Sequence, residues 1–142
     1  MTPAEIISNV VATIALILSV YGFRRDKKTE KRNHEFDLFR DIYQEFLVIR
    51  LPTARAKVKI SRAGLVSGVD ELVHELNEIR KQSIYFSYAE PQFFEELRMT
   101  LWELEDYLTL IEEPFVGEAR VDFDHEVTAK LKKIYKCILR KF

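Results

Sequence analysis

An uncharged, mostly apolar run near the start of the chain constrains its fold more than any other feature. Residues 6–23 read IISNVVATIALILSVYGF, and the cationic cluster RRDKK follows directly. Eighteen helical residues extend about 27 Å at about 1.5 Å per residue, close to the roughly 30 Å hydrocarbon thickness of a bilayer. An apolar run with a cationic end is typical of a membrane-spanning helix, and the sequence therefore predicts one over residues 6–23.

A cleaved signal peptide and a buried core helix are the alternative interpretations of this run. A signal peptide carries positive charge before its apolar core, whereas here Glu5 precedes the core and the basic residues follow it. Lys and Arg accumulate on the cytoplasmic side of a span, so we expect a single-pass membrane protein with its N-terminus outside and residues 24–142 in the cytoplasm. The single Cys137 excludes an internal disulfide and fits a reducing compartment.

Small and polar residues within the run fall on particular faces of the expected helix. Four of them share one face through 4-3-4 spacing: Ser8, Ala12, Ala15 and Ser19. Such a face allows helices to pack closely and predicts self-association. Asn9 and Thr13 are one turn apart on a neighbouring face. These six residues are expected to serve transmembrane packing or to line a pore, although Asn9 could equally lie at the outer interface in contact with water and headgroups.

The remaining residues 24–142 are enough for one domain with one modest core. The whole chain contains four Gly and four Pro, which favours long helices. Apolar residues at helical spacing predict that the first helix continues through residues 36–47 until Pro52 ends it. A short helix is expected over residues 53–66, although alternating apolar and basic residues leave a strand open for residues 55–62.

Three further helices are predicted in the second half of the chain. Asp70 is the expected N-cap of a helix whose inner face carries Leu72, Leu76, Ile79 and Ser83. Pro91 opens the next helix, which has a coiled-coil-like seam: Phe94, Leu97, Leu101, Leu104, Leu108 and Ile111. The last helix carries an apolar stripe of Val127, Leu131, Ile134 and Ile138. The predicted fold is therefore all-α, with a transmembrane segment over residues 1–23 and a cytoplasmic bundle of four or five helices over residues 24–142.

The net charge of −1 conceals a strong segregation of charge along the chain. Residues 24–62 and 130–142 are basic, whereas residues 90–118 are acidic. Four basic residues after the run are expected to contact anionic lipid headgroups: Arg24, Arg25, Lys27 and Lys28. Four more have two interpretations: Arg55, Lys57, Lys59 and Arg62. They bind an anionic ligand (a nucleotide or nucleic acid) or a protein partner, or they pair with the acidic segment of the same or a neighbouring chain.

No sequence motif indicates catalysis. The chain has no Gly-rich loop followed by Lys-Ser/Thr and no HExxH. Glu71 with His74, and Asp122 with His125, each place a carboxylate near an imidazole, as helical bundles with di-metal sites do. The second pair uses Asp and lies at or before the start of the last helix, so we expect surface histidines, no metal, no cofactor and no catalytic residues.

The N-terminal third resembles a group of small bacterial proteins. The span ATIALILSVYGF, the basic stop RRDKKTEKR and the helix FDLFRDIYQEF together resemble single-span proteins of anti-phage and abortive-infection loci, over roughly residues 10–60. The resemblance implies an effector in the bacterial inner membrane whose cytoplasmic part senses a signal or partner and whose spans assemble and permeabilise the membrane. It implies no catalytic residues.

Two functions are therefore predicted. The first is a homo-oligomeric single-span membrane effector or channel, controlled by a ligand or partner at its cytoplasmic helical domain, in anti-phage defence. The second is a membrane-tethered adaptor that recruits a cytoplasmic partner. A heterologous single span would preserve the adaptor function and abolish the effector function.

Overall fold

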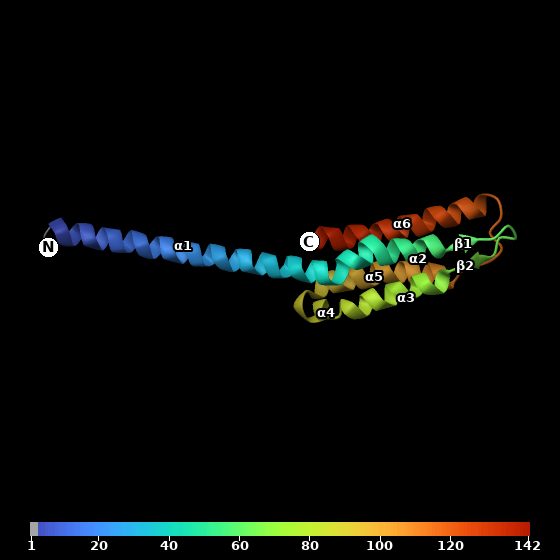
Figure 1. The fold of residues 1–142 in the computed structure, drawn as a ribbon, viewed down its shortest axis with the longest axis horizontal. Coiled ribbons are helices and arrows are strands. Elements are labelled where there is room, and N and C mark those ends of the chain that lie inside the picture. Colours follow the sequence, from blue (N-terminus) through green and yellow to red (C-terminus); the bar gives the residue numbers. More distant parts are fainter. Residues whose placement is uncertain (1–2) are drawn as a thin grey trace. The chain divides into compact units, whose positions relative to one another are not determined.

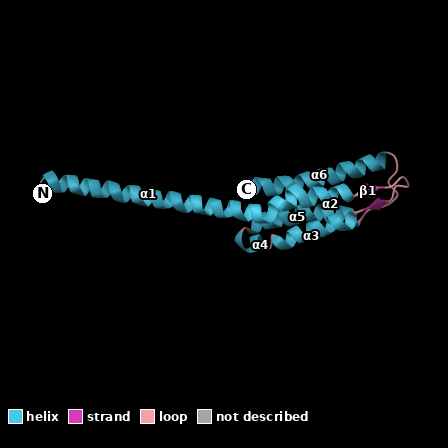
Figure 2. Ribbon diagram, in the orientation of Figure 1, coloured by secondary structure: helices cyan, strands magenta, loops and turns pink. Residues whose placement is uncertain are grey.

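A computed structural model describes residues 3–142 of the chain, with side chains described for residues 12–142. The chain divides into two compact units, one that ends at Leu38 and one that comprises Phe39–Phe142. The elements are labelled in Figure 1: α1 Pro3–Phe39, η1 Arg40–Gln44, η2 Phe46–Arg50, α2 Leu51–Lys57, β1 Lys59–Ile60, β2 Val66–Ser67, α3 Val69–Gln82, α4 Tyr85–Ala89, α5 Pro91–Thr109 and α6 Glu118–Lys141. The expected all-helical class is confirmed, because β1 and β2 add only a two-residue ladder (Figure 2).

The predicted membrane span is wrong. The helix α1 is long, but none of the helices in the described part of the chain is both long and apolar enough to cross a bilayer. Where the side chains of α1 are described, its uncharged run covers residues 12–23, and these twelve residues extend about 18 Å against a roughly 30 Å hydrocarbon core. Charged residues follow at once from Arg24. The single-pass topology and the inner-membrane localisation, which depended on this span, are wrong with it.

The helical chain does not end at Pro52, contrary to the prediction. Pro52 lies in the first turn of α2, and the helix continues to Lys57. Proline has no N–H, and its ring collides with the carbonyl group four residues earlier in an α-helix. The preceding elements η1 and η2 are π-helical, so their hydrogen bonds span five residues, and this wider geometry accommodates the proline ring.

Residues 55–62 combine both structures that the sequence left open. Arg55 to Lys57 are helical, whereas β1 pairs antiparallel with β2, with Lys59 opposite Ser67 and Ile60 opposite Val66. The expected helix over residues 53–66 is therefore wrong beyond Lys57. The hairpin leads to Gly68, whose φ is +79° and where a Cβ atom would overlap the carbonyl oxygen of Lys57. Only glycine fits there.

Gly68, and not Asp70, occupies the N-cap position of α3, and no side-chain cap bond forms. Asp70 lies in the first helical turn, where its negative charge favours the positive end of the helix dipole. The predicted inner face of α3 is confirmed, since all four of its members are buried: Leu72, Leu76, Ile79 and Ser83.

The unit Phe39–Phe142 is a helical bundle around one apolar core. The helix α5 packs against α3, α4 and α6, and so provides the centre of the bundle (Figure 1). Pro91 opens α5 as predicted, and its buried seam is Phe93, Leu97, Leu101, Leu104 and Leu108. The predicted end positions Phe94 and Ile111 are only partly buried. The stripe of α6 is confirmed at Val127, Ile134 and Ile138, and Leu131 is partly buried.

Aromatic rings fill one end of this core. Tyr43 is fully buried, and its ring centroid lies 6.2 Å from that of Phe86 and 6.3 Å from that of Phe93. Phe142 completes the cluster, and its ring centroid lies 5.7 Å from that of Tyr43, 6.0 Å from that of Phe86 and 5.9 Å from that of Phe93. Three of these rings are buried, those of Tyr43, Phe86 and Phe93, so the cluster closes this end of the core.

Candidate functional site

The apolar segment of α1, defined here as residues 12–23, has no charged residue on any side and exposes most of its large apolar side chains. Their exposed fractions run from 49% to 68%: Ile14, Leu16, Ile17, Leu18, Val20, Tyr21 and Phe23. Isolated exposed apolar residues are normal on a protein surface, whereas a helix that is apolar on all sides is normally buried. This segment is therefore a candidate interaction surface.

The residues predicted for transmembrane packing or a pore belong to this helix. Ala12, Ala15 and Ser19 are exposed and share one face of α1, as their spacing requires, and Thr13 lies on the same helix. The side chains of Ser8 and Asn9 lie outside the described residues. The expected role of these residues inside a bilayer has no basis without the span, whereas their role in helix packing stays a prediction.

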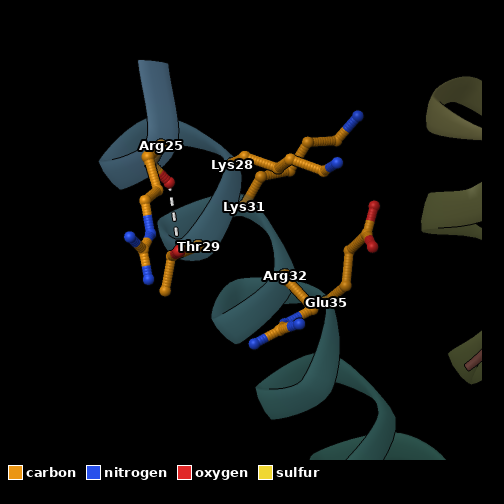
Figure 3. A pocket seen from close by; sticks show the side chains of 6 residues that line it. All are labelled: Arg25, Lys28, Thr29, Lys31, Arg32 and Glu35. Atoms are coloured by element: carbon orange, nitrogen blue, oxygen red, sulfur yellow. Dashed lines mark hydrogen bonds between the residues drawn. The ribbon is translucent and has the colours of Figure 1, made fainter. Parts of the chain in front are cut away.

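The basic segment, residues 24–32, follows on α1. A hollow of about 430 Å³ on its surface is lined by Arg25, Lys28, Thr29, Lys31, Arg32 and Glu35. Figure 3 shows Lys28, Lys31 and Glu35 extending from the helix toward the same side. The Thr29 hydroxyl donates a hydrogen bond of 3.0 Å to the Arg25 carbonyl oxygen and so turns back onto the helix. The lining carries four cations against one carboxylate, which gives this side of α1 a positive potential.

Lipid contacts were expected of four basic residues because they follow the predicted span: Arg24, Arg25, Lys27 and Lys28. Without that span the reason for these contacts no longer holds. The Lys27 ammonium instead lies 4.9 Å from the centroid of the Phe23 ring, a cation–π contact within α1.

The four basic residues predicted to bind an anionic ligand are spread over three elements. Arg55 forms an ion pair with Asp124, and the Lys57 ammonium donates a 2.6 Å hydrogen bond to Glu71. Lys59 lies on β1 and Arg62 in the turn after it, and both side chains are exposed. The two pairs lie within the chain, as one interpretation expected, but their acids lie outside residues 90–118. Anion binding by the four residues stays a prediction.

Acidic residues of α5 form ion pairs with basic residues near the end of α6. The sequence analysis did not predict these pairs. Lys133 donates a 2.9 Å hydrogen bond to Glu103, which lowers the pKa of that carboxyl group. Glu96 pairs with Arg140, and Glu90 lies 2.9 Å from Lys141. Opposite charge on two successive helices joined by a short loop was the available signal, because such helices pack antiparallel.

A second hollow, of about 330 Å³, lies on the bundle and is lined by Arg80, Arg98, Trp102 and Glu105. Arg80 pairs with Glu105 at 3.1 Å, and Arg98 pairs with Glu95 at 2.7 Å. The side chain of Trp102 is 51% exposed. The sequence analysis did not single out Trp102, although its position between the seam residues Leu101 and Leu104 indicates that its side chain points outward.

The described side chains include three histidines and one cysteine, residue types that could bind a metal or act in catalysis. In the part of the chain that the structure describes, no three His, Cys, Asp or Glu side chains are placed to hold a metal ion. Glu71, which the sequence places near His74, accepts a hydrogen bond from Lys57. Cys137 is buried, and this burial raises the pKa of its thiol, so the thiolate needed for nucleophilic chemistry is disfavoured.

Comparison of the chain with protein-family models, curated proteins and solved structures finds no match. The resemblance to small effectors of anti-phage loci therefore stays a prediction about residues 10–60.

Proposed function

We propose that this chain is a homo-oligomeric assembly protein that acts by binding and not by catalysis. In this proposal α1 is the self-association element, and the bundle Phe39–Phe142 is the module that the assembly presents to a ligand or partner. The observation that carries the proposal is the exposure of seven large apolar side chains within the uncharged residues 12–23.

Burial of this segment against a second copy of the chain is energetically favourable. Burial of one large apolar side chain contributes about 1.5–3 kcal/mol, and association costs about 4–15 kcal/mol in lost freedom. Seven such side chains on each copy are therefore enough to support association even when each is only partly covered. A copy of the same helix also offers a matching length of apolar surface.

Co-purification of tagged and untagged full-length copies tests the proposal. The untagged copy should be retained with the tagged one, and Ile17→Asp in both copies should abolish the retention. Val48→Asp is the matched control, because Val48 is an exposed apolar side chain of the bundle at 68% exposure. Equal retention of both variants would contradict the proposal, and so would a chain that stays monomeric while its first helix binds phospholipid vesicles.

Recruitment of a protein partner is a second candidate function, supported by the half-exposed Trp102, which lines a hollow together with Arg80 and Arg98. Trp and Arg are the residues most enriched among those that dominate binding energy at interfaces. Immobilised peptides would be screened with the full-length chain and with its Trp102→Ala variant. Peptides bound by the first and lost with the second support the adaptor function, whereas identical binding by both contradicts it.

A further inference from the structure

Two unlike faces run along α1 from the apolar segment into the basic segment. The first, the large-cationic face, follows 3-4-3-4-3 spacing: Ile14, Ile17, Tyr21, Arg24, Lys28 and Lys31. All six side chains are exposed, and Glu35 follows at its end. Spacing of this kind keeps residues on one side of a helix and is the pattern of a helix–helix seam.

The second face, the small-acidic face, begins two residues earlier: Ala12, Ala15, Ser19, Gly22, Asp26 and Glu30. Two residues correspond to a rotation of about 200°, so the two faces lie on opposite sides of α1. Each face changes from apolar or small to charged near residue 23, and the charge that follows is positive on one face and negative on the other.

This arrangement selects which faces meet when two copies associate. Contact between two large-cationic faces would bring Arg24, Lys28 and Lys31 of one copy against the same cations of the other. Contact between two small-acidic faces would leave Ile14, Ile17 and Tyr21 exposed. Contact between unlike faces places large side chains over Ala12, Ala15 and Gly22, where small residues let helices approach closely. It also places the cations beside Asp26 and Glu30.

The direction of the helices follows from the same distribution. In a parallel pair, the apolar segment of one copy lies level with the apolar segment of the other. The cations lie level with Asp26 and Glu30, with an offset of about two residues, or roughly 3 Å. An antiparallel pair aligned over residues 12–23 would carry the basic segments of the two copies to opposite ends, so the cations of one copy would lie away from Asp26 and Glu30 of the other.

We infer that copies of this chain associate through α1 as parallel helices, with the large-cationic face of each copy against the small-acidic face of its neighbour; this rests on the proposed function. A contact between unlike faces generates a closed ring or an open array and not a two-fold dimer. The occupant of each face is thus a second copy of this chain, recognised by side-chain size and by charge.

Disulfide trapping in the full-length chain tests the inference. In a Cys137→Ser background, tagged copies carrying Ile17→Cys are co-expressed with untagged copies carrying Ser19→Cys, and mild oxidation follows. Mixed dimers between positions 17 and 19 should dominate, and each variant expressed alone should give less than about a tenth of that yield. Abundant 17–17 dimers would overturn the inference.

Charge reversal gives a readout that does not depend on cysteine geometry. Lys28→Glu with Lys31→Glu should weaken self-association, and so should Asp26→Lys with Glu30→Lys. Co-expression of the two double variants should restore mixed oligomers, because their faces become complementary again.

Unchanged self-association of each double variant alone would overturn the inference. A monomeric wild-type chain would overturn the proposed function as well, whereas an oligomer that traps 17–17 dimers would overturn the inference alone.

Discussion

The hydroxyl groups of Tyr43 and Ser83 form a hydrogen bond of 2.8 Å inside the bundle, where both residues are fully buried. The Ser83 hydroxyl also donates a 2.7 Å hydrogen bond to the Ile79 carbonyl oxygen. A serine hydroxyl has one hydrogen, so Tyr43 is the donor in the bond to Ser83. This bond ties the π-helical η1 to the end of α3, and it makes the two residues unequal in their effect on stability.

Ser83→Ala should destabilise the bundle more than Tyr43→Phe. The first change leaves the Tyr43 hydroxyl buried without a partner, which costs about 1–3 kcal/mol, whereas the second leaves Ser83 bonded to Ile79 and costs about 0.5–1.5 kcal/mol. Urea unfolding followed by the fluorescence of the single Trp102 measures both. The double variant should lose less than the sum of the two losses. A smaller loss for Ser83→Ala than for Tyr43→Phe would contradict this account of the bond.

Stability should fall in alkaline solution, partly through Tyr43. Burial raises the pKa of Tyr43 above its ordinary value near 10, although its hydrogen bond with Ser83 acts in the opposite direction. Above pH 10 the unfolded chain therefore releases a proton that the folded chain retains, and the free energy of unfolding falls with pH by up to about 1.4 kcal/mol per unit. Burial raises the pKa values of Tyr107 and Tyr135 in the same direction.

The matched variant for this titration is Tyr43→Phe, measured beside the wild type from pH 8 to pH 11. Below the ordinary tyrosine pKa the difference between the two proteins should be constant, and above it the wild type should lose stability more steeply. Parallel curves over the whole range would show that Tyr43 does not contribute.

Gly68→Ala should cost considerably more than a left-handed backbone alone explains. Gly68 has φ +79° and ψ 6°, a conformation in which alanine costs about 1–2 kcal/mol. The new Cβ atom would also overlap the Lys57 carbonyl oxygen. Thermal unfolding by circular dichroism measures the variant, and a loss of no more than about 2 kcal/mol would refute the close approach of Gly68 to Lys57.

Glu75→Gln should destabilise the bundle by about 1–3 kcal/mol. Removing one partner of a fully buried ion pair costs more, roughly 3–5 kcal/mol. The Arg50 guanidinium lies 2.7 Å from the Glu75 carboxylate, and the two side chains are only 25% and 16% exposed. Glu71→Gln is the control, because Glu71 pairs with Lys57 at the surface, where such pairs contribute about 0–1 kcal/mol. Urea unfolding in low and high salt measures both, and a larger loss for the control would contradict the ranking.

The bundle was predictable from periodicity because its helices bury one face each. The seams of α3, α5 and α6 follow from 3-4 spacing, and Pro91 marks the start of α5 correctly. Predictions from the residue type alone were wrong where the surrounding structure determined the conformation of the backbone. The π-helical turns accommodate Pro52, and the close approach at Gly68 replaces the side-chain cap expected from Asp70.

The candidate site was less predictable. The run over residues 6–23 has the composition of a span, but the structure gives no helix in its described part that satisfies both the length and the hydropathy of one. The spread of Arg55 and Lys57 away from Lys59 and Arg62 depends on a hairpin that alternation alone could not separate from a helix. The composition does not show that Trp102 is exposed. Its position between the seam residues Leu101 and Leu104 does indicate that it points outward.

The mass of the full-length chain in solution tests the central claim most directly. Light scattering across a range of concentrations should give a multiple of the 16.8 kDa chain mass for the wild type and for Val48→Asp, and a value near 16.8 kDa for Ile17→Asp. A wild-type chain that stays at the mass of a monomer at every concentration would contradict assembly through α1.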